Sequence, residues 1–209
     1  MQSSTKKQHW EKIYKEKDTT TDVSWYQNNP KTSIELILST GAGKGASIID
    51  IGGGDSRLVD RLLELKYKKI FVLDISGEAL MKIKKRLGEK ASSVTWIESD
   101  ILKFNTKARF DVWHDRATFH FLTKGQDIFR YVKITDRFLK PGGFLIISTF
   151  SLSGPKKCSG LDTSRYSDSS MQKAFGEKFN YIKSFERIHE TPFNTKQSFL
   201  WSVFKKPIN

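Results

Sequence analysis

A turn rich in glycine follows one short apolar run of the sequence. Residues 48–56 read IIDIGGGDS, so a run that contains Asp50 ends in three consecutive glycines. Glycine lacks Cβ, so a ligand can approach the backbone closely, and a turn that leads into a helix presents N–H groups and the positive end of the helix dipole. Arg57 stands where the dinucleotide pattern GxGxxG has its third glycine. The segment therefore predicts a ligand site, but not a snug pyrophosphate site.

Two acidic residues follow at the ends of the next two apolar runs. Asp74 lies near the end of IFVLDI (70–75), 20 residues after Gly54, where an acid of a nucleotide-binding α/β fold accepts hydrogen bonds from a ribose diol. Asp100 follows VTWIES (94–99), where a carboxylate can meet the exocyclic amine of an adenine. Open α/β sheets bind ligands at the carboxyl ends of their strands. These features in register predict a nucleoside-bearing cofactor.

The elements that must position these residues alternate along the chain. Apolar runs of strand length are separated by helix-like segments such as SRLVDRLLEL (56–65) and GEALMKIKKRL (77–87), which predicts parallel strands with helical crossovers. Segments 181–190 and 197–206 read instead as an antiparallel hairpin. The core elements expected are strands at 47–51, 70–75, 94–100, 110–114 and 144–150 and a helix at 127–139. The fold class is therefore α/β.

Composition narrows the class of protein. The 209 residues suit a single domain, and no stretch approaches the roughly 18 apolar residues of a membrane span. One cysteine, Cys158, rules out a disulfide framework within the chain, and the polar N-terminus has no secretory signal, so we expect a cytoplasmic protein. The net charge of +13 attracts nucleic acid. Because the lysines alternate with apolar and acidic residues, only weak, nonspecific nucleic-acid binding is expected.

Four motifs connect these features to a known family. They are IIDIGGGDS, VLDIS, SDIL and LKPGG, within residues 47–150, and together they resemble the class I S-adenosylmethionine-dependent methyltransferases. The resemblance implies a Rossmann-like, seven-stranded, mostly parallel sheet whose last strand is antiparallel, with S-adenosylmethionine as cofactor and S-adenosylhomocysteine as product. It places Asp50 near the cofactor's amino group, Asp74 on the ribose and Asp100 on the adenine. The candidate cofactor residues are Trp25, Tyr26, Asp50, Gly52, Gly53, Gly54, Ser56, Asp74, Ile75, Asp100, Ile101 and Asp115.

The N-terminal segment carries a second resemblance. WEKIYKEK followed by SWYQ resembles a subgroup that includes lysine methyltransferases of translation elongation factors. It implies that Trp25 and Tyr26 belong to a lid at the cofactor's methionine end; alternatively, Trp10, Trp25 and Tyr26 only attach the N-terminal helices to the core. HWEKIYKEK (9–17) and NPKTSIELILSTG (29–41) are expected to form two helices over the edge of the sheet. The single domain would divide into a helical lid or cap (1–46), a cofactor-binding core (47–150), and an acceptor-side loop, helix and C-terminal hairpin (151–209).

Titratable residues gather after the fourth expected strand. The segment DVWHDRATFHFL (111–122) contains the candidate catalytic residues His114, Asp115 and His120, and a histidine can act as the base for a protonated acceptor. Alternatively, His114 is a strand residue bonded to Asp115 or to a carbonyl. The resembling lysine methyltransferases carry Asp-Lys-Gly-Thr at positions 115–118 and an acid in place of His120, which puts protein-lysine specificity in doubt. Ligands that all come from one short segment rarely surround a metal ion in three dimensions, so no metal is expected here.

The segment TFSLSGPKKCSGLDTSRY (149–166) follows the fifth expected strand and would form the second wall of the acceptor pocket. The candidate acceptor residues are Arg116, Cys158, Arg165 and Tyr166, with inert packing as the alternative for Cys158. The sequence therefore predicts a methyltransferase that acts by in-line displacement on a small-molecule acceptor. The alternatives are a protein lysine N-methyltransferase and a non-catalytic cofactor-binding partner module. No membrane is expected as a partner; the sequence leaves the oligomeric state open, and a monomer is assumed.

Overall fold

The computed structural model describes residues 3–208; residues 1 and 2 of the expected lid and residue 209 of the expected acceptor-side segment lie outside this part. The strands are β1 (Ser47–Ile51), β2 (Lys69–Asp74), β3 (Val94–Glu98), β4 (Phe110–Arg116), β5 (Leu139–Phe150), β6 (Lys157–Cys158), β7 (Leu161–Asp162), β8 (Asn180–Glu190) and β9 (Lys196–Lys205). The α-helices are α1 (Ser3–Glu16), α2 (Lys31–Ser39), α3 (Leu58–Glu64), α4 (Gly77–Leu87), α5 (Gly125–Phe138) and α6 (Asp168–Phe175), and short 3-10 helices span Gly88–Ser93, Ile101–Lys103 and Phe119–Phe121.

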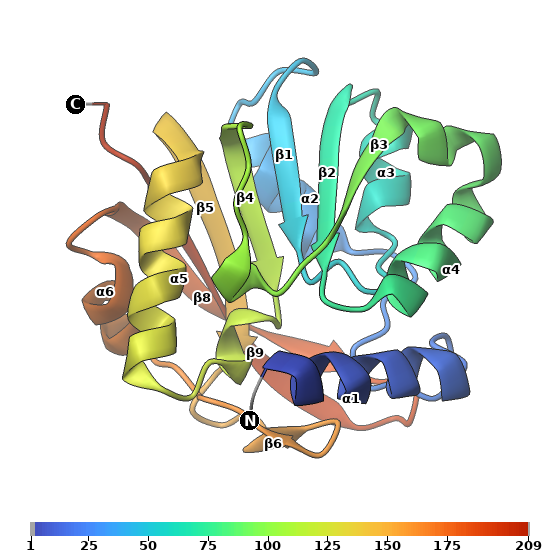
Figure 1. Ribbon diagram of the computed structural model, residues 1–209. Helices are drawn as coiled ribbons and strands as arrows, with labels where there is room; N and C mark the ends of the chain where they lie inside the picture. The colour runs from blue at the N-terminus through green and yellow to red at the C-terminus, as the bar shows by residue number, and fades with distance from the viewer. Residues whose placement is uncertain (1–2, 209) are drawn as a thin grey trace.

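Seven of these strands form one twisted sheet in the order β3-β2-β1-β4-β5-β9-β8 (Figure 1). The pairs from β3 to β5 are parallel, whereas β9 runs antiparallel to both β5 and β8. The predicted Rossmann-like sheet with an antiparallel last strand is therefore confirmed. Within residues 3–208, no helix combines the length and the apolar composition that crossing a bilayer would require.

Helices cover both faces of the sheet because side chains alternate along each buried strand. Ile48 of β1 packs in a cluster with Leu36 and Ile37 of α2 and with apolar residues of α3 and α4. Its neighbour Ile49 packs on the opposite face, in the cluster formed with α5 and α6. The expectation that α2 would lie over the edge of the sheet is wrong, because Ile37 is fully buried against the face.

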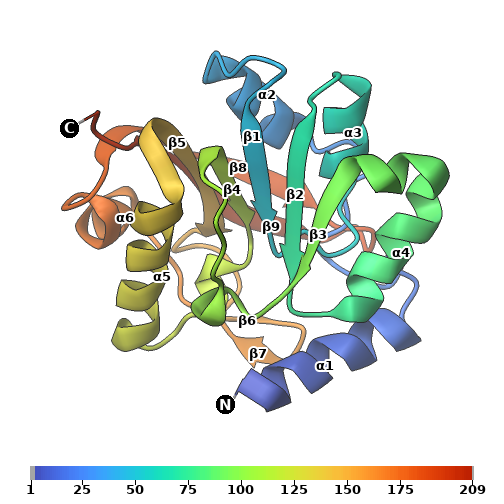
Figure 2. The same ribbon diagram turned by 45° about the horizontal axis from the view of Figure 1, so that its top comes forward.

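Helix α1, by contrast, crosses the sheet at the carboxyl ends of its parallel strands. It lies beyond the arrowheads of β1 and β4 in Figure 1 and keeps that place in the turned view of Figure 2. The carboxyl ends of the parallel strands are therefore covered by the first helix of the chain.

Among the elements from residue 47 on, the start of β5 differs most from the sequence prediction, whereas the other predicted strands and helices differ by at most two residues at their ends. Strand β5 begins at Leu139 rather than at 144 and includes Pro141, Gly142 and Gly143, which lie between the expected helix (127–139) and the expected strand (144–150). An irregularity in pairing with β4 absorbs these residues, because Leu139 pairs with Phe110 and Phe144 pairs with Val112. Proline is tolerated in a strand at such a bulge.

Candidate functional site

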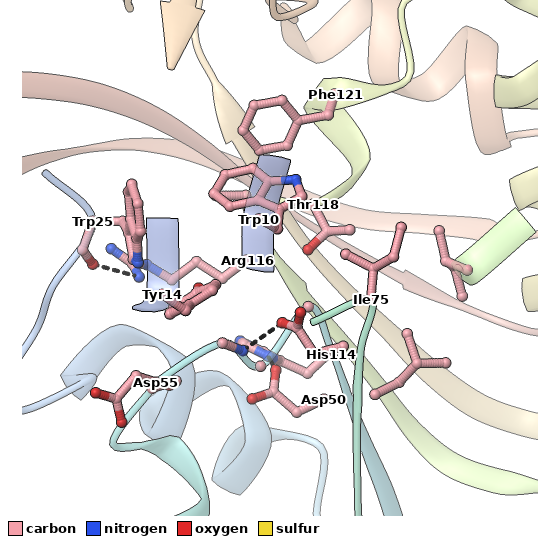
Figure 3. Close-up of a pocket in the computed structure, with 18 of the residues that line it drawn as sticks. Trp10, Tyr14, Trp25, Asp50, Asp55, Ile75, His114, Arg116, Thr118 and Phe121 are labelled. Carbon is pink, nitrogen blue, oxygen red and sulfur yellow. Dashed lines mark hydrogen bonds and ion pairs between the residues drawn. The ribbon is translucent and has the colours of Figure 1, made fainter. Parts of the chain in front are cut away.

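A cavity lies between α1 and the carboxyl ends of β1 to β4, and Figure 3 shows some of the residues that line it. Every candidate cofactor residue except Asp115 lines it: Trp25, Tyr26, Asp50, Gly52, Gly53, Gly54, Ser56, Asp74, Ile75, Asp100 and Ile101. The parallel strands bring these residues together from positions up to 76 apart, between Trp25 and Ile101. Among the described residues, no group of three or more His, Cys, Asp and Glu side chains is arranged to hold a metal ion.

The glycine turn after β1 is held against the end of β2. Gly52 and Gly54 have positive φ angles of 63° and 53°, which favour glycine. The N–H groups of Gly52 and Gly53 donate to the Leu73 carbonyl, at 2.7 and 3.1 Å. The turn was expected to offer such N–H groups to a ligand, yet these are already satisfied within the fold. The glycines instead allow close packing within the fold, because a Cβ at Gly52 would overlap Thr118 Oγ1 and a Cβ at Gly54 would overlap the Tyr14 hydroxyl.

Asp74 joins the glycine turn to the end of β2. Its Oδ2 accepts from the Gly54 N–H and its Oδ1 from the Ser76 N–H, both at 2.8 Å. Burial raises the pKa of Asp74 to about 6, although these two N–H groups act in the opposite direction and the nearby Asp50 adds to the rise. A carboxylate has about four acceptor positions, so both oxygens can still accept hydrogen bonds from a ligand.

Asp100 occupies the corresponding place after β3. Its Oδ1 accepts from the Leu102 N–H at 2.9 Å and so caps the short helix Ile101–Lys103. The side chain also lines the cavity. Thus Asp74 and Asp100, at the ends of two successive strands, each accept hydrogen bonds from the backbone of a nearby turn and line the same cavity.

Asp50 and His114 form a buried pair with Ser33. His114 Nδ1 lies 2.7 Å from Asp50 Oδ1, and His114 Nε2 lies 3.0 Å from Ser33 Oγ. The pair exists because Asp50 of β1 and His114 of β4 occupy partner positions in the parallel register. His114 was proposed either as a base or as a strand histidine bonded to Asp115 or a carbonyl. The structure instead bonds it to Asp50, with all three side chains on the cavity wall.

Asp115, a candidate for both catalysis and cofactor binding, does not line the cavity. Successive strand residues point to opposite faces, so Asp115 is buried away from His114. Its Oδ1 accepts from the Thr118 and Phe119 N–H groups, and its Oδ2 accepts from the Tyr131 hydroxyl at 2.6 Å. The structure therefore contradicts a contacting role for Asp115, which instead fixes the turn that carries Thr118.

His120 is also fully buried outside the cavity lining. Its ring packs on Phe150 with centroids 4.5 Å apart, and its Nδ1 accepts from the Phe150 N–H at 3.4 Å. Burial, together with the nearby Arg116 charge, lowers the pKa of His120 to about 3. The imidazole stays neutral at physiological pH and does not face the reaction space, so the expectation of a catalytic His120 is wrong.

The four candidate acceptor residues divide into two groups. Arg116 and Cys158 line the cavity, and burial raises the pKa of the Cys158 thiol, which disfavours a thiolate. Arg165 and Tyr166 do not line it. Arg165 Nη1 donates to the Leu152 carbonyl at 2.5 Å, and the buried ring of Tyr166 packs on Phe119. The loop after β5 turns these two side chains away from the cavity, which corrects the sequence prediction.

Aromatic residues of the N-terminal segment cover the cavity. The ring centroid of Trp25 lies 5.8 Å from that of Trp10 and 6.3 Å from that of Tyr14, and the ring centroids of Trp10 and Phe121 lie 5.2 Å apart. Figure 3 labels these four residues. Sequence reasoning did not assign Trp10 or Tyr14 to the site. Their spacing of four residues, which places both on one face of a helix, is the signal that could have done so.

Glu11 attaches the covering helix to the rest of the site. Its carboxylate accepts from the Gly77 and Glu78 N–H groups at 3.0 and 3.1 Å and from the Ser76 hydroxyl at 2.9 Å. Burial alone would raise the pKa of Glu11, but these hydrogen bonds and Lys7 hold it below its usual value. The contact places a negative charge at the N-terminus of α4, where the helix dipole stabilises it.

Comparisons with known proteins agree with this architecture. The profile of the family described as "Methyltransferase domain" matches residues 42–201. Malonyl-[acyl-carrier protein] O-methyltransferase 2 of Ilyobacter polytropus is 30% identical over 105 residues, which cover 50% of this chain and 39% of that protein. This chain therefore matches about two fifths of that relative's length.

Two solved structures share the fold over nearly the whole chain. A structure from work on the conversion of a disulfide bond into a thioacetal group during echinomycin biosynthesis has a TM-score of 0.79 and 17% identity, covering 97% of this chain and 94% of its own. The N-methyltransferase NodS from Bradyrhizobium japonicum, in complex with S-adenosylhomocysteine, has a TM-score of 0.71 and 17% identity, covering 95% and 99%.

Proposed function

The chain belongs to the methyltransferase-domain family, whose profile matches residues 42–201, and on this premise we propose that it transfers a methyl group from S-adenosylmethionine to a small-molecule acceptor. One observation carries the proposal. The glycine turn, Asp74 and Asp100 line a single cavity at the carboxyl ends of three neighbouring strands. This is the edge at which open α/β sheets bind their ligands.

The residues of the cavity fit this cofactor. Asp50 presents a negative charge for an amino group, and the glycine turn beside it lines the same cavity. Asp74 and Asp100 provide acceptors for a ribose diol and an adenine amine. The cofactor supplies a methyl group on a sulfonium for in-line displacement; the protein binds, orients and excludes water.

The cover of the cavity supports a small acceptor. Trp10, Tyr14 and Trp25 lie over the carboxyl edge, and α1 is attached to α4 through Glu11. Such a cover encloses a small molecule more readily than it admits a folded protein. The relatives named above include an O-methyltransferase and an N-methyltransferase, so the acceptor atom is not carried over from them.

We place the function in a reducing, cytoplasmic setting, which the single buried Cys158 supports. The division into a lid or cap (1–46), a cofactor-binding core (47–150) and an acceptor-side part (151–209) is part of the proposal. The cavity-lining positions of Trp25 and Cys158 support it, because one comes from each flanking part.

The test uses the whole chain and two measurements. Calorimetry with S-adenosylhomocysteine asks whether the cofactor binds, and labelled S-adenosylmethionine incubated with metabolite pools, total protein and total RNA asks where the methyl group goes. Label in a small molecule supports the proposal. Label in protein favours the lysine alternative. Binding without acceptor-dependent release of S-adenosylhomocysteine favours the non-catalytic partner module.

A further inference from the structure

Arg116 is a cation of the cavity wall that forms no ion pair with any acid among the residues that the structure describes. It ends β4, on the same side of the sheet as His114, and lines the cavity. Its Nη1 donates to the Trp25 carbonyl at 3.0 Å, the bond drawn as a dashed line in Figure 3. Its Nη2 is buried and has no hydrogen-bond partner, although the residue as a whole is partly exposed. The guanidinium also lies over the Phe199 ring, 5.6 Å from its centroid.

The acids of the same cavity are engaged elsewhere. Asp50 bonds to His114, Asp74 to two backbone N–H groups and Asp100 to the Leu102 N–H. Asp55 forms an ion pair with Arg86. Within the described part of the chain, Arg116 therefore takes part in no ion pair at its position, and burial lowers the pKa of its guanidinium to about 10.

A buried charge without a partner is costly, and the cost is offset when a ligand supplies the opposite charge. A guanidinium presents a planar fork of N–H donors that matches a carboxylate with two parallel hydrogen bonds. The neighbouring groups do not compete for that role: His120 is neutral and Cys158 is a thiol whose pKa is raised by burial.

We propose that Arg116 is the receptor for a carboxylate group of a ligand bound in this cavity. The inference rests on the proposed function and adds the chemical class that the site recognises. Two molecules can supply the carboxylate: the amino-acid end of the cofactor, with Asp50 holding the amino group, or a carboxylate-bearing acceptor placed against the aromatic cover. The receptor chemistry is the same in both cases, and two binding experiments distinguish the sources.

The first experiment measures the cofactor carboxylate. Calorimetry compares S-adenosylhomocysteine with its decarboxylated analogue in the wild-type protein and in Arg116→Met. If Arg116 binds the cofactor, the wild type should prefer the carboxylate form by about 10- to 100-fold, as expected for a charge-assisted hydrogen bond, and the variant should lose this preference. Arg116→Lys, which keeps the charge but not the fork, should retain part of it.

The second experiment measures the acceptor side. The protein saturated with S-adenosylhomocysteine is titrated with benzoate and, separately, with the uncharged isostere benzamide, and the fluorescence of the cavity tryptophans is followed. If Arg116 serves the acceptor, benzoate should bind at least about tenfold more tightly than benzamide in the wild type, and Arg116→Met should abolish the difference. Arg165→Met, at an arginine outside the cavity, should behave as wild type in both experiments.

The outcomes separate cleanly, provided that thermal melting shows the variants to be folded. An Arg116-dependent carboxylate preference in either experiment supports the inference and names the source. Preferences that are absent, or that survive in Arg116→Met, overturn it even when S-adenosylhomocysteine binds well. Failure of the wild type to bind S-adenosylhomocysteine contradicts the proposed function itself, and the inference falls with it.

Discussion

The carboxylate of Asp50 and the imidazole of His114 face each other across two neighbouring strands, with Oδ1 and Nδ1 2.7 Å apart. Both side chains are buried, and Asp50 is 4% exposed. With the proton on Nδ1, His114 donates to Asp50 and accepts from the Ser33 hydroxyl at its other nitrogen. The histidine therefore orients the carboxylate beside the glycine turn.

This pairing predicts that His114→Ala weakens binding of S-adenosylhomocysteine about tenfold and lowers the free energy of unfolding by about 1–3 kcal/mol, because a buried acceptor loses its donor. His114→Asn can return an N–H to Asp50 and should recover part of both losses. Ser33→Ala keeps the Asp50–His114 bond and should change affinity less. Calorimetry and urea unfolding measure the two effects, and unchanged affinity in folded His114→Ala would contradict the orienting role.

Asp74 should make cofactor binding depend on pH. Its folded-state pKa is raised to about 6 by burial, and a ribose diol hydrogen-bonds best to the ionised carboxylate. Affinity should therefore be about tenfold weaker at pH 5 than at pH 7. The effect of pH on folding stability has the opposite sign. The stability linked to the raised pKa of Asp74 is present at a pH below its unfolded-state pKa of 3.8 and is lost as the pH rises through its folded-state pKa of about 6.

Two variants test the assignment to Asp74. Asp74→Asn should remove the pH dependence of binding and weaken affinity at pH 7 by about 1–3 kcal/mol. Asp115→Asn is the matched control, because burial also raises the pKa of Asp115 to about 6 although it lies outside the cavity. A pH dependence that persists in Asp74→Asn and disappears in Asp115→Asn would reverse the assignment.

The glycine turn should tolerate no side chain. Gly54→Val should weaken binding of S-adenosylhomocysteine by at least about 100-fold, because the new side chain, on a backbone that already has positive φ, would displace Tyr14 of the cavity wall. Gly41→Ala is the control: Gly41 also has a positive φ, of 72°, but a Cβ there meets nothing within 4 Å. It should lose about 1–2 kcal/mol of stability and keep its affinity. Equal affinity losses in both variants would point to general backbone strain instead.

We propose that the N-terminal segment acts as a lid attached through Glu11. Cofactor should slow proteolysis near Lys15 and Lys17 by ordering Trp25 and Tyr26, which line the cavity. Glu11→Ala removes the contacts to the start of α4 and should speed cleavage, whereas Glu16→Ala, at an exposed position of the same helix, should not. Because folding lowers the pKa of Glu11, its contribution to the free energy of unfolding is present at a pH above its unfolded-state pKa. That contribution is lost as the pH falls through its folded-state pKa. Cleavage rates that do not respond to cofactor would exclude a lid.

Nucleic acid should bind only weakly despite the net charge of +13. We expect binding of structured RNA to be sequence-independent and to fall steeply up to about 150 mM salt, as counterion release requires. Filter binding with and without S-adenosylhomocysteine measures it. Tight, salt-tolerant binding that strengthens with cofactor would make RNA the leading acceptor.

The alternation of strands and helices and the cofactor side of the cavity could be predicted before the structure was known, because the signals are local. Asp74 and Asp100 each lie at the end of an apolar run, and the carboxyl ends of parallel strands must meet at one edge. The terminal hairpin could likewise be predicted, because segments 181–190 and 197–206 are joined by a short turn. The start of β5 was not, because a bulge in its pairing with β4, and not local composition, decides whether Pro141 belongs to the strand.

The positions of the candidate catalytic and acceptor residues depend on tertiary contacts that the local sequence does not reveal. His114, Asp115 and His120 are close in sequence, yet the alternation of a strand and the turn that follows send them to three different environments. Trp10 and Tyr14 reach the cavity from a helix more than 30 residues before β1. Arg116 is defined by its contacts: among residues 3–208 it meets the Trp25 carbonyl and the Phe199 ring but forms no ion pair with an acid. Whether a buried charge finds its partner within the chain or must receive one from a ligand is settled only when distant segments pack together.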